Sequence, residues 1–245
     1  MLIARPVFSA QIPHEATEPH QQAIQSTIDS FRTGDIEAIT QKIQFPLARR
    51  YPLPPVNNPK YFGRRYSEIF DSTLGKLIAT SNAKTDWERV GWRGYMLKRG
   101  LVWTDENGRI IGINYESKKE QTIRAGLIEA DRNALHKSLR TFDEPKLKWD
   151  TKNYRLRIDA LGEDYRLAVW PAGRNYESKP LLIIERGTLT FDGSGGNHHY
   201  SFPLGKKVYV CDVQIIGCAE EPHIGSFGLL MDEKILFSEE SIRGY

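Results

Sequence analysis

The stretch "GWRGYMLKRGLVWTDENGRIIGINYES", residues 91–117, determines how the first half of the chain folds. It contains two tryptophans and five glycines, and two turn signals interrupt it. Asn107-Gly108 favours a hairpin because both residue types accept a positive φ, and residues 98–100 are typical of a second turn. We therefore expect three antiparallel strands that follow one another along the chain, near residues 92–97, 101–104 and 109–115.

The apolar residues of this stretch alternate along the third expected strand. A period of two puts Ile111 and Ile113 on one face and Ile110 on the other. Gly94 and Gly112 have no side chain, so they leave room for a bulky ring or a helix to approach the sheet. The density of glycine and tryptophan is therefore explained by tight strands, without a catalytic site.

Helical periodicity precedes these strands. In residues 19–43 apolar side chains recur at helical spacing, and the turn at residues 33–35 divides the segment into two helices, the second capped by Asp35. The next segment, "FPLARRY" at residues 45–51, is compatible with a strand. The prolines of "PLPPVNNP", residues 52–59, predict a loop because each removes a donor and fixes φ. A third helix is expected over residues 64–82, where the helical period returns.

After the strands the pattern becomes helical once more and then changes to β. Eight short strand-like runs, divided by Gly, Pro, Asp and Asn, are typical of an antiparallel sandwich or barrel. We therefore expect an α+β protein with four parts. They are an N-terminal tail at 1–19, helices packed on a curved antiparallel sheet at 20–117, a linking helix at 118–142, and an all-β sandwich or barrel domain at 143–245.

Residues 86–115, "DWERVGWRGYML" followed by G.VW.D..G.I..INY, resemble the central part of poorly characterised two-domain bacterial proteins. The order of two helices, a strand, a third helix and a curved meander is similar to the nuclear-transport-factor-like cone fold, which ketosteroid-isomerase-like proteins share. The resemblance covers residues 20–116 and implies a cone-like first domain. It implies no single activity, because this fold hosts isomerases, hydratases, receptors and structural modules. A full cone continues into further long strands that wall a pocket, whereas this chain turns helical near Ser117.

The composition fits a globular chain long enough for two domains, with 245 residues, 40% of them hydrophobic and 27% charged. No apolar run reaches the ~20 residues that span a bilayer, so no membrane partner is expected. The net charge is +3, and residues 1–120 hold 17 basic and 13 acidic side chains, far short of the excess typical of nucleic-acid-binding proteins. The opening "MLIARPVFSA" lacks the basic start and the length of a secretory signal, so a cytoplasmic and a periplasmic location both stay open.

A basic and aromatic cluster lies in "ARRYPLPPVNNPKYFGRRY", residues 48–66, and no Asp or Glu occurs between residues 38 and 67. Arginine next to aromatic rings favours anionic ligands and protein interfaces, through bidentate hydrogen bonds and stacking. The alternative is a solvated loop whose arginines pair with acids elsewhere in the fold. The candidate ligand- or partner-binding residues are Arg49, Arg50, Tyr51, Lys60, Tyr61, Arg64 and Arg65.

A catalytic site is harder to identify. Isomerases with the cone fold use a carboxylate base opposite acidic donors in a dry pocket. The candidates here are the carboxylates Asp71, Asp86 and Glu88 and the donors Tyr66 and Tyr95. The sequence supplies no identifiable pair among them, so we assign no catalytic residue.

The histidines and cysteines form no recognised metal motif. His198 and His199 are adjacent on an expected strand, so their side chains point to opposite faces. His223 and Cys218 are close in sequence but lack ligand spacing. Cys211 and Cys218 are either free thiols or, if the chain bends sharply between them, a disulfide. The glycine-rich "DGSGGNHH" has strands on both sides, so it predicts a hairpin loop rather than a phosphate site. We expect neither a metal nor a cofactor.

Two functions from different classes remain. The first is a non-catalytic, two-domain binding or inhibitory protein that recognises a protein partner or a small anionic ligand through the basic and aromatic cluster. The second is a small-molecule isomerase or hydratase that uses a carboxylate in the N-terminal cone. A buried Asp or Glu that faces a Tyr in an apolar pocket would favour the second.

Overall fold

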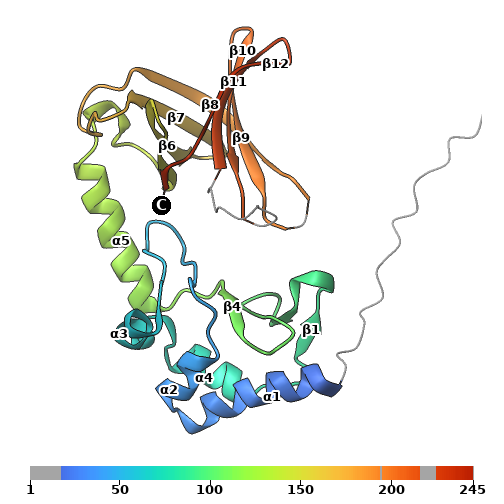
Figure 1. Ribbon diagram of the computed structural model, residues 1–245. Coiled ribbons are helices and arrows are strands. Elements are labelled where there is room, and N and C mark those ends of the chain that lie inside the picture. The colour runs from blue at the N-terminus through green and yellow to red at the C-terminus, as the bar shows by residue number, and fades with distance from the viewer. Residues whose placement is uncertain (1–17, 194, 216–224, 245) are drawn as a thin grey trace, which may run out of the picture. The chain divides into compact units, whose positions relative to one another are not determined.

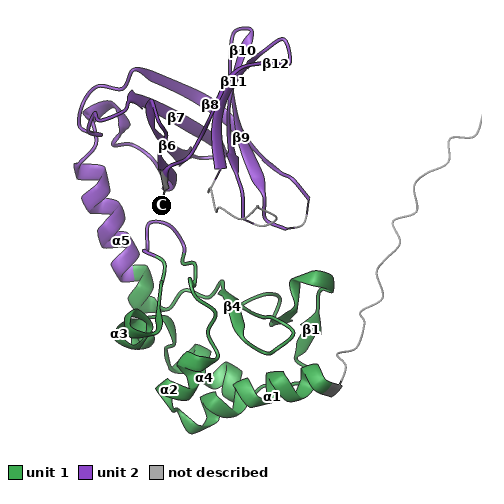
Figure 2. Ribbon diagram, viewed as in Figure 1, with its two compact units in different colours: residues 1–49, 55–121 green, residues 50–54, 122–245 purple. Residues whose placement is uncertain are grey.

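The computed structural model describes residues 18–193, 195–215 and 225–244 (Figure 1). The chain forms two compact units (Figure 2). Unit 1 comprises Met1–Arg49 and Pro55–Gln121, and unit 2 comprises Arg50–Pro54 and Thr122–Tyr245. Helix α5, Lys118–Asn133, begins in unit 1 and ends in unit 2. None of the described helices has the length and the hydropathy needed to cross a membrane.

The described part of unit 1 contains four α-helices besides the start of α5. They are α1 (Glu18–Thr33), α2 (Ile36–Gln41), α3 (Pro59–Ile69) and α4 (Ser72–Ala79). The expected division at residues 33–35 is confirmed, because Asp35 accepts hydrogen bonds from the backbone N–H groups of Glu37 and Ala38 and so caps α2.

The single helix expected over residues 64–82 is wrong, since α3 and α4 are separate. Asn58 accepts a hydrogen bond from the backbone N–H of Tyr61, and Pro59 follows it in the first turn, where a missing donor costs nothing. Helix α3 therefore begins inside the segment that was expected to be a loop. Asp71 accepts from two backbone N–H groups of the next turn and so starts α4 as a new helix.

The quoted stretch contributes three of the four strands of the unit 1 sheet. The strands are β1 (Trp87–Arg89), β2 (Tyr95–Leu97), β3 (Val102–Thr104) and β4 (Ile110–Ile113), antiparallel and in chain order. The expected meander is thus confirmed, although its first strand is shorter because a 3₁₀ turn, η1, occupies Gly91–Arg93. Apolar side chains of all four helices and of this sheet form one core.

A β-bulge changes which isoleucines face that core. Thr104 pairs with Ile110 and Trp103 with Gly112, so Ile111 is an extra residue without a partner on β3. As a result Ile110 and Ile113 both point into the core, with 0% and 5% of their surface exposed. The expectation that Ile111 and Ile113 share a face is therefore wrong, because the bulge interrupts the period of two.

Two glycines let the backbone of the sheet approach its neighbours. Gly94 has φ +89°, and a Cβ there would lie 2.0 Å from the carbonyl oxygen of Thr104. Gly108 has φ +74°, and a Cβ there would lie 2.4 Å from the carbonyl oxygen of Ala23 in α1. The hydroxyl of Thr27 donates to the carbonyl oxygen of Gly108 at 2.7 Å. The β3–β4 turn therefore packs directly on α1 at Gly108. Gly112 makes room for a ring, as expected, because a Cβ there would lie 3.9 Å from Cδ1 of Trp103.

Unit 2 is a meander of antiparallel strands that form one curled sheet, a half-barrel (Figure 1). The strands are β5 (Glu144–Asp150), β6 (Tyr154–Leu161), β7 (Asp164–Pro171), β8 (Leu182–Phe191), β9 (His198–Leu204), β10 (Lys207–Val213), β11 (Gly225–Met231), β12 (Lys234–Glu240) and β13 (Arg243–Gly244). Strand β12 pairs with β11, and β13, two residues further along the chain, pairs with β5 at the opposite edge.

Both faces of the curled sheet carry buried apolar side chains, the inner face along most of its strands and the outer face at β7. The inward-facing side chains form one core, in which Trp149, Phe202 and Phe227 have almost no exposed surface. On the outer face of β7, Ala168 and Trp170 pack against residues that follow α5, including those of the 3₁₀ turn η2 (Lys137–Leu139). The middle of β7 is therefore buried on both faces, and its residues 167–170 form a continuous apolar run.

A network of buried charges ties α5 to this outer face. The side chain of Arg157 on β6 is fully buried and forms ion pairs with Asp131 of α5 and, at 2.7 Å, with Asp159. Arg166 of β7 lies 2.9 Å from Asp159, and Lys148 of β5 lies 2.8 Å from Asp131. Burial alone would raise the pKa of Asp131, but Arg157 and Lys148 outweigh it and hold the pKa below its ordinary value.

Gly94→Ala should destabilise unit 1, because the new methyl group would overlap the Thr104 carbonyl at a φ that L residues rarely adopt. We expect a loss of about 2–4 kcal/mol in the free energy of unfolding, measured by urea titration. Gly75→Ala is the matched control, since Gly75 lies in α4 with nothing within 4 Å of the added Cβ. That control should gain about 0.5–1 kcal/mol. A Gly94→Ala protein as stable as the parent would contradict the tight packing of these strands.

Unit 2 should lose stability in acid through Asp131. Its pKa is lower in the folded state than in the unfolded chain, so its contribution is complete above about pH 4 and is lost as the pH falls through the depressed folded value. Asp131→Asn should lower the free energy of unfolding at neutral pH by about 3–5 kcal/mol, because Arg157 is left buried beside one acid fewer. Asp131→Asn should also reduce the loss of folding stability that the parent shows below about pH 4.

Urea titrations at several pH values measure both effects of Asp131→Asn. The exposed Asp164, at the start of β7, supplies the control Asp164→Asn, which should change stability by less than about 0.5 kcal/mol. An acid dependence identical in the parent and in Asp131→Asn would show that this network does not stabilise unit 2.

Candidate functional site

The structure divides the predicted basic and aromatic cluster into three groups. The first is buried in unit 1, the second belongs to unit 2, and the third is exposed on α3. In that order they are Arg49 and Arg65; Arg50 and Tyr51; and Lys60, Tyr61 and Arg64.

Arg49 and Arg65 hold a buried carboxylate. The side chain of Glu120, in the first turn of α5, has no exposed surface, and that of Arg49 has 2%. Arg49 Nε lies 2.9 Å from Glu120 Oε1, and the same guanidinium donates to two backbone carbonyls at and just after the end of β4. Arg65 lies 3.5 Å from Glu120 and 3.1 Å from Glu68. These two arginines therefore join α3, β4 and α5 and are committed to the fold.

Arg50 and Tyr51 are committed to unit 2. Arg50 forms an ion pair with Glu144 of β5 at 2.6 Å, and Arg124 of α5 donates to the backbone carbonyl of Tyr51 at 2.8 Å. Burial raises the pKa of the Tyr51 hydroxyl, and the nearby negative charge of Asp131 raises it further. The short loop Arg50–Pro54 thus anchors itself in unit 2, although unit 1 supplies the chain on both sides of it.

Lys60, Tyr61 and Arg64 lie on the solvent side of α3. They occupy one face of the helix, and the opposite face carries its buried residues into the core. Tyr61 is 45% exposed, and the side chains of Lys60 and Arg64 are exposed without an ion-pair partner among the described residues. Lys119 of α5 extends the row, because its Nζ lies 3.5 Å from the hydroxyl of Ser67, one turn beyond Arg64. Its Nζ also lies 4.0 Å from the carboxylate of Glu68, so one acidic side chain adjoins this end of the row. We name Lys60, Tyr61, Arg64 and Lys119 the α3 basic face.

A shallow groove of about 560 Å³ borders the α3 basic face. It lies between α2 and α3 and is lined by Ile36, Glu37, Thr40, Gln41, Pro59 and Lys60. Ile36 is 44% exposed at the start of α2, so an apolar side chain stands beside the cations of α3. Nothing in the sequence singles out Ile36, because one exposed isoleucine in the first turn of a short helix carries no signal of its own.

The carboxylates proposed for catalysis have structural roles or lie at the surface. Asp71 caps α4 with Oδ1, and its Oδ2 accepts from the hydroxyl of Tyr115 at 2.7 Å. Asp86 accepts from a backbone N–H in its own turn, and Glu88 is exposed on β1. The structure brings none of the three together with the expected donors: the hydroxyl of Tyr95 hydrogen-bonds with His20 at 2.7 Å, and Tyr66 stacks on Phe70.

The histidines on β9 point to opposite faces, as expected. His198 Nδ1 lies 2.8 Å from the carbonyl oxygen of Gly196 and therefore carries the proton, whereas His199 contacts Asp192 at 3.0 Å. Cys211 is a buried free thiol, and burial raises its pKa. Cys218 and His223 lie outside the described residues. Among the residues that the structure covers, no three His, Cys, Asp or Glu side chains gather as a metal site would require.

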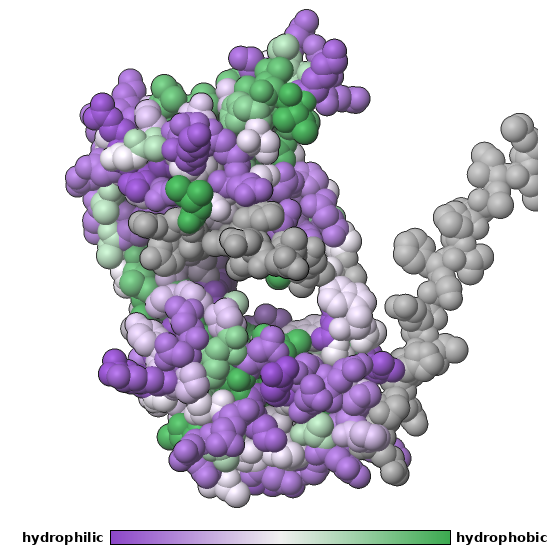
Figure 3. Space-filling model, viewed as in Figure 1, coloured by the Kyte–Doolittle hydropathy of each residue, from purple (hydrophilic) through white to green (hydrophobic). Residues whose placement is uncertain are grey.

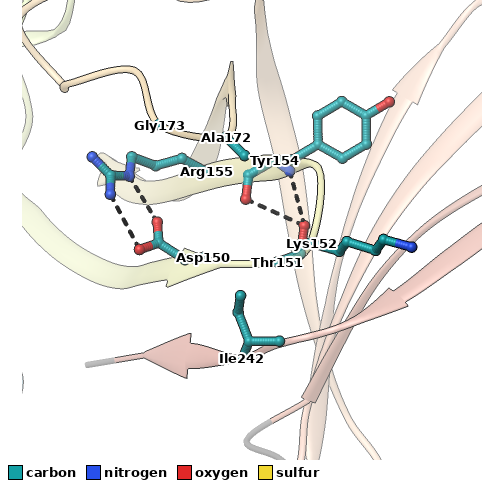
Figure 4. A pocket seen from close by; sticks show the side chains of 8 residues that line it. All are labelled: Asp150, Thr151, Lys152, Tyr154, Arg155, Ala172, Gly173 and Ile242. Atoms are coloured by element: carbon teal, nitrogen blue, oxygen red, sulfur yellow. Dashed lines mark hydrogen bonds and ion pairs between the residues drawn. The ribbon is translucent and has the colours of Figure 1, made fainter.

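A smaller pocket of about 270 Å³ lies at the β5–β6 turn of unit 2 (Figure 4). Its lining residues are Asp150, Thr151, Lys152, Tyr154, Arg155, Ala172, Gly173 and Ile242. Asp150 and Arg155 form an ion pair at 2.7 Å, and the hydroxyl of Thr151 donates to Glu239 at 2.8 Å. These polar groups hold β5, β6 and β12 together, so we assign the pocket a structural role.

Glu120→Gln should destabilise unit 1, because it leaves Arg49 buried without a negative charge. We expect a loss of about 3–5 kcal/mol in the free energy of unfolding, measured by urea titration. Arg64→Gln, on the α3 basic face, should change stability by less than about 0.5 kcal/mol. Equal losses in the two variants would contradict the division between structural and exposed arginines.

Comparisons with known proteins identify no relative of this chain, so the site is interpreted from its own geometry. No family model matches the chain, and neither a curated protein nor a solved structure does so.

Proposed function

We propose that this protein is a non-catalytic binding protein whose α3 basic face accepts an acidic segment of a protein partner. Lys60, Arg64 and Lys119 would pair with carboxylates of that segment, and Tyr61 and Ile36 would contact its apolar side chains. The observation that carries the proposal is the division of the basic residues. Arg49 and Arg65 both pair with the buried Glu120, whereas the side chains of Lys60 and Arg64 stay at the surface.

The form of the α3 basic face favours an extended chain over a compact anion. Lys60 and Arg64 are four residues apart on one helix, which places their Cβ atoms about 5–6 Å from each other along its axis. Lys119 continues the row from the neighbouring helix. The adjacent groove is shallow and mixes an exposed isoleucine with polar side chains, a composition typical of protein interfaces rather than of an enclosed small-molecule site.

The cone-like architecture of unit 1 belongs to the same proposal. Helices that pack on a short antiparallel sheet support it, and so does the start of α5 directly after β4. In a cone of this kind the sheet is too short to wall a deep pocket, so binding would occur on the outside of the helices. A carboxylate-based isomerase has less support, because Asp71 is engaged in capping α4 and in accepting from the hydroxyl of Tyr115.

Binding of a defined acidic peptide tests the proposal. A fluorescein-labelled peptide rich in Glu and Leu should bind the full chain in a fluorescence anisotropy titration, and a counterpart with Lys in place of Glu should not. Reversing two charges with Lys60→Glu and Arg64→Glu should weaken binding by about 10-fold or more, because each charge-assisted contact is replaced by repulsion. Tyr61→Ala should weaken it without changing its dependence on salt.

The matched control changes the same amount of charge elsewhere in unit 1. Lys84→Glu combined with Lys98→Glu reverses two exposed lysines that are not on α3. This pair should leave the affinity within about 2-fold of the parent. Equal weakening by both pairs would show that only the overall charge matters. Displacement of the peptide by inorganic phosphate alone would assign the face to a small anion and overturn the proposal of a protein partner.

A further inference from the structure

The outer face of the half-barrel carries an apolar stripe across four strands. Pro203 of β9 lies opposite Val208 of β10, which lies opposite Leu230 of β11, which in turn lies opposite Ile235 of β12. The neighbouring row, which includes Phe202, faces the core, so these four side chains face outward. We name them the outer stripe.

The outer stripe is open to solvent at both ends. Ile235 is 69% exposed, Pro203 is exposed, and Val208 and Leu230 are half-buried. Leu236, the extra residue of a bulge beside Leu230, adds another side chain that is 50% exposed. Figure 3 shows apolar side chains gathered at this end of the sheet, next to hydrophilic hairpin turns. Contiguous apolar surface of this kind marks a site of association.

Charges of opposite sign stand at the two turns beside the outer stripe. The β9–β10 turn carries Lys206, and the β11–β12 turn carries Asp232 and Glu233. Lys207 follows the first turn and Lys234 follows the second. Both pair with Met231, and the side chains of this row face the other side of the sheet, so they do not adjoin the outer stripe. The turn at the β9 end of the stripe is therefore basic, and the turn at the β12 end is acidic.

We infer that the outer stripe is the interface between two copies of this chain. A two-fold axis that lies in the interface, parallel to the strands, places the β9 end of one stripe on the β12 end of the other. Lys206 of each copy then faces Asp232 and Glu233 of its mate, and this happens twice. The stripe is thus complementary to itself in charge as well as in apolar character. A lipid surface would instead meet the acidic turn, whose two carboxylates oppose anionic headgroups.

Sedimentation velocity of the full chain tests this inference independently of the α3 basic face. At concentrations up to about 100 µM, a dimer that dissociates near 10 µM would be largely assembled, and we expect a dimer to form. Ile235→Ser should raise the dissociation constant by about 10-fold or more. Leu181→Ser is the control, because Leu181 is 66% exposed but lies just before β8, outside the stripe; it should leave the dissociation constant unchanged.

A charge swap separates this dimer from non-specific association of apolar surface. The change Lys206→Glu alone, and the double change Asp232→Lys with Glu233→Lys alone, should each raise the dissociation constant by about 3-fold or more, since like charges then face each other. The two together should restore it to within about 2-fold of the parent, since opposite charges are paired again. A chain that stays monomeric over the whole range would overturn the inference. So would a dimer that the swap does not restore or that Leu181→Ser weakens as much as Ile235→Ser.

Discussion

A carboxylate with no exposed surface has to be matched by positive charge, and Glu120 imposes this requirement on unit 1. Arg49 satisfies it and at the same time donates to the backbone just after the sheet, so the start of α5 is fixed relative to β4. Arg65 brings α3 to the same carboxylate. Unit 2 obeys the same rule, because Asp131 and Asp159 surround the fully buried Arg157. In both units these networks consume cations that would otherwise be available to a ligand.

Much of the fold follows from local signals in the sequence. The helix stop before Asp35, the meander after residue 91 and the change to β structure beyond α5 each depend on residues within a few positions of one another. The errors have a different origin. The bulge at Ile111 depends on how β4 pairs with β3, and the break between α3 and α4 depends on which turn the side chain of Asp71 caps. Neither the strand pairing nor the helix cap can be detected from the spacing of apolar residues.

The candidate site could be located from the sequence, but its members could not be sorted. The cluster of basic and aromatic residues is visible because these side chains are close in the chain. The acidic partners of these arginines are far away in the sequence, because Arg49 and Glu120 are 71 positions apart and Arg50 and Glu144 are 94 positions apart. The outer stripe was hidden for a similar reason, since its four residues become neighbours only through the register of four strands.

The loop Arg50–Pro54 has a consequence for how the protein is made and how it can be divided. Because this loop belongs to unit 2 while its flanks belong to unit 1, the chain passes between the units at residues 49–50, 54–55 and 121–122. A single protease cut within α5 would therefore strip Arg50 and Tyr51 from the C-terminal fragment. On the ribosome, these residues emerge well before the strand that carries Glu144, so the second unit can be completed only after that strand has been synthesised.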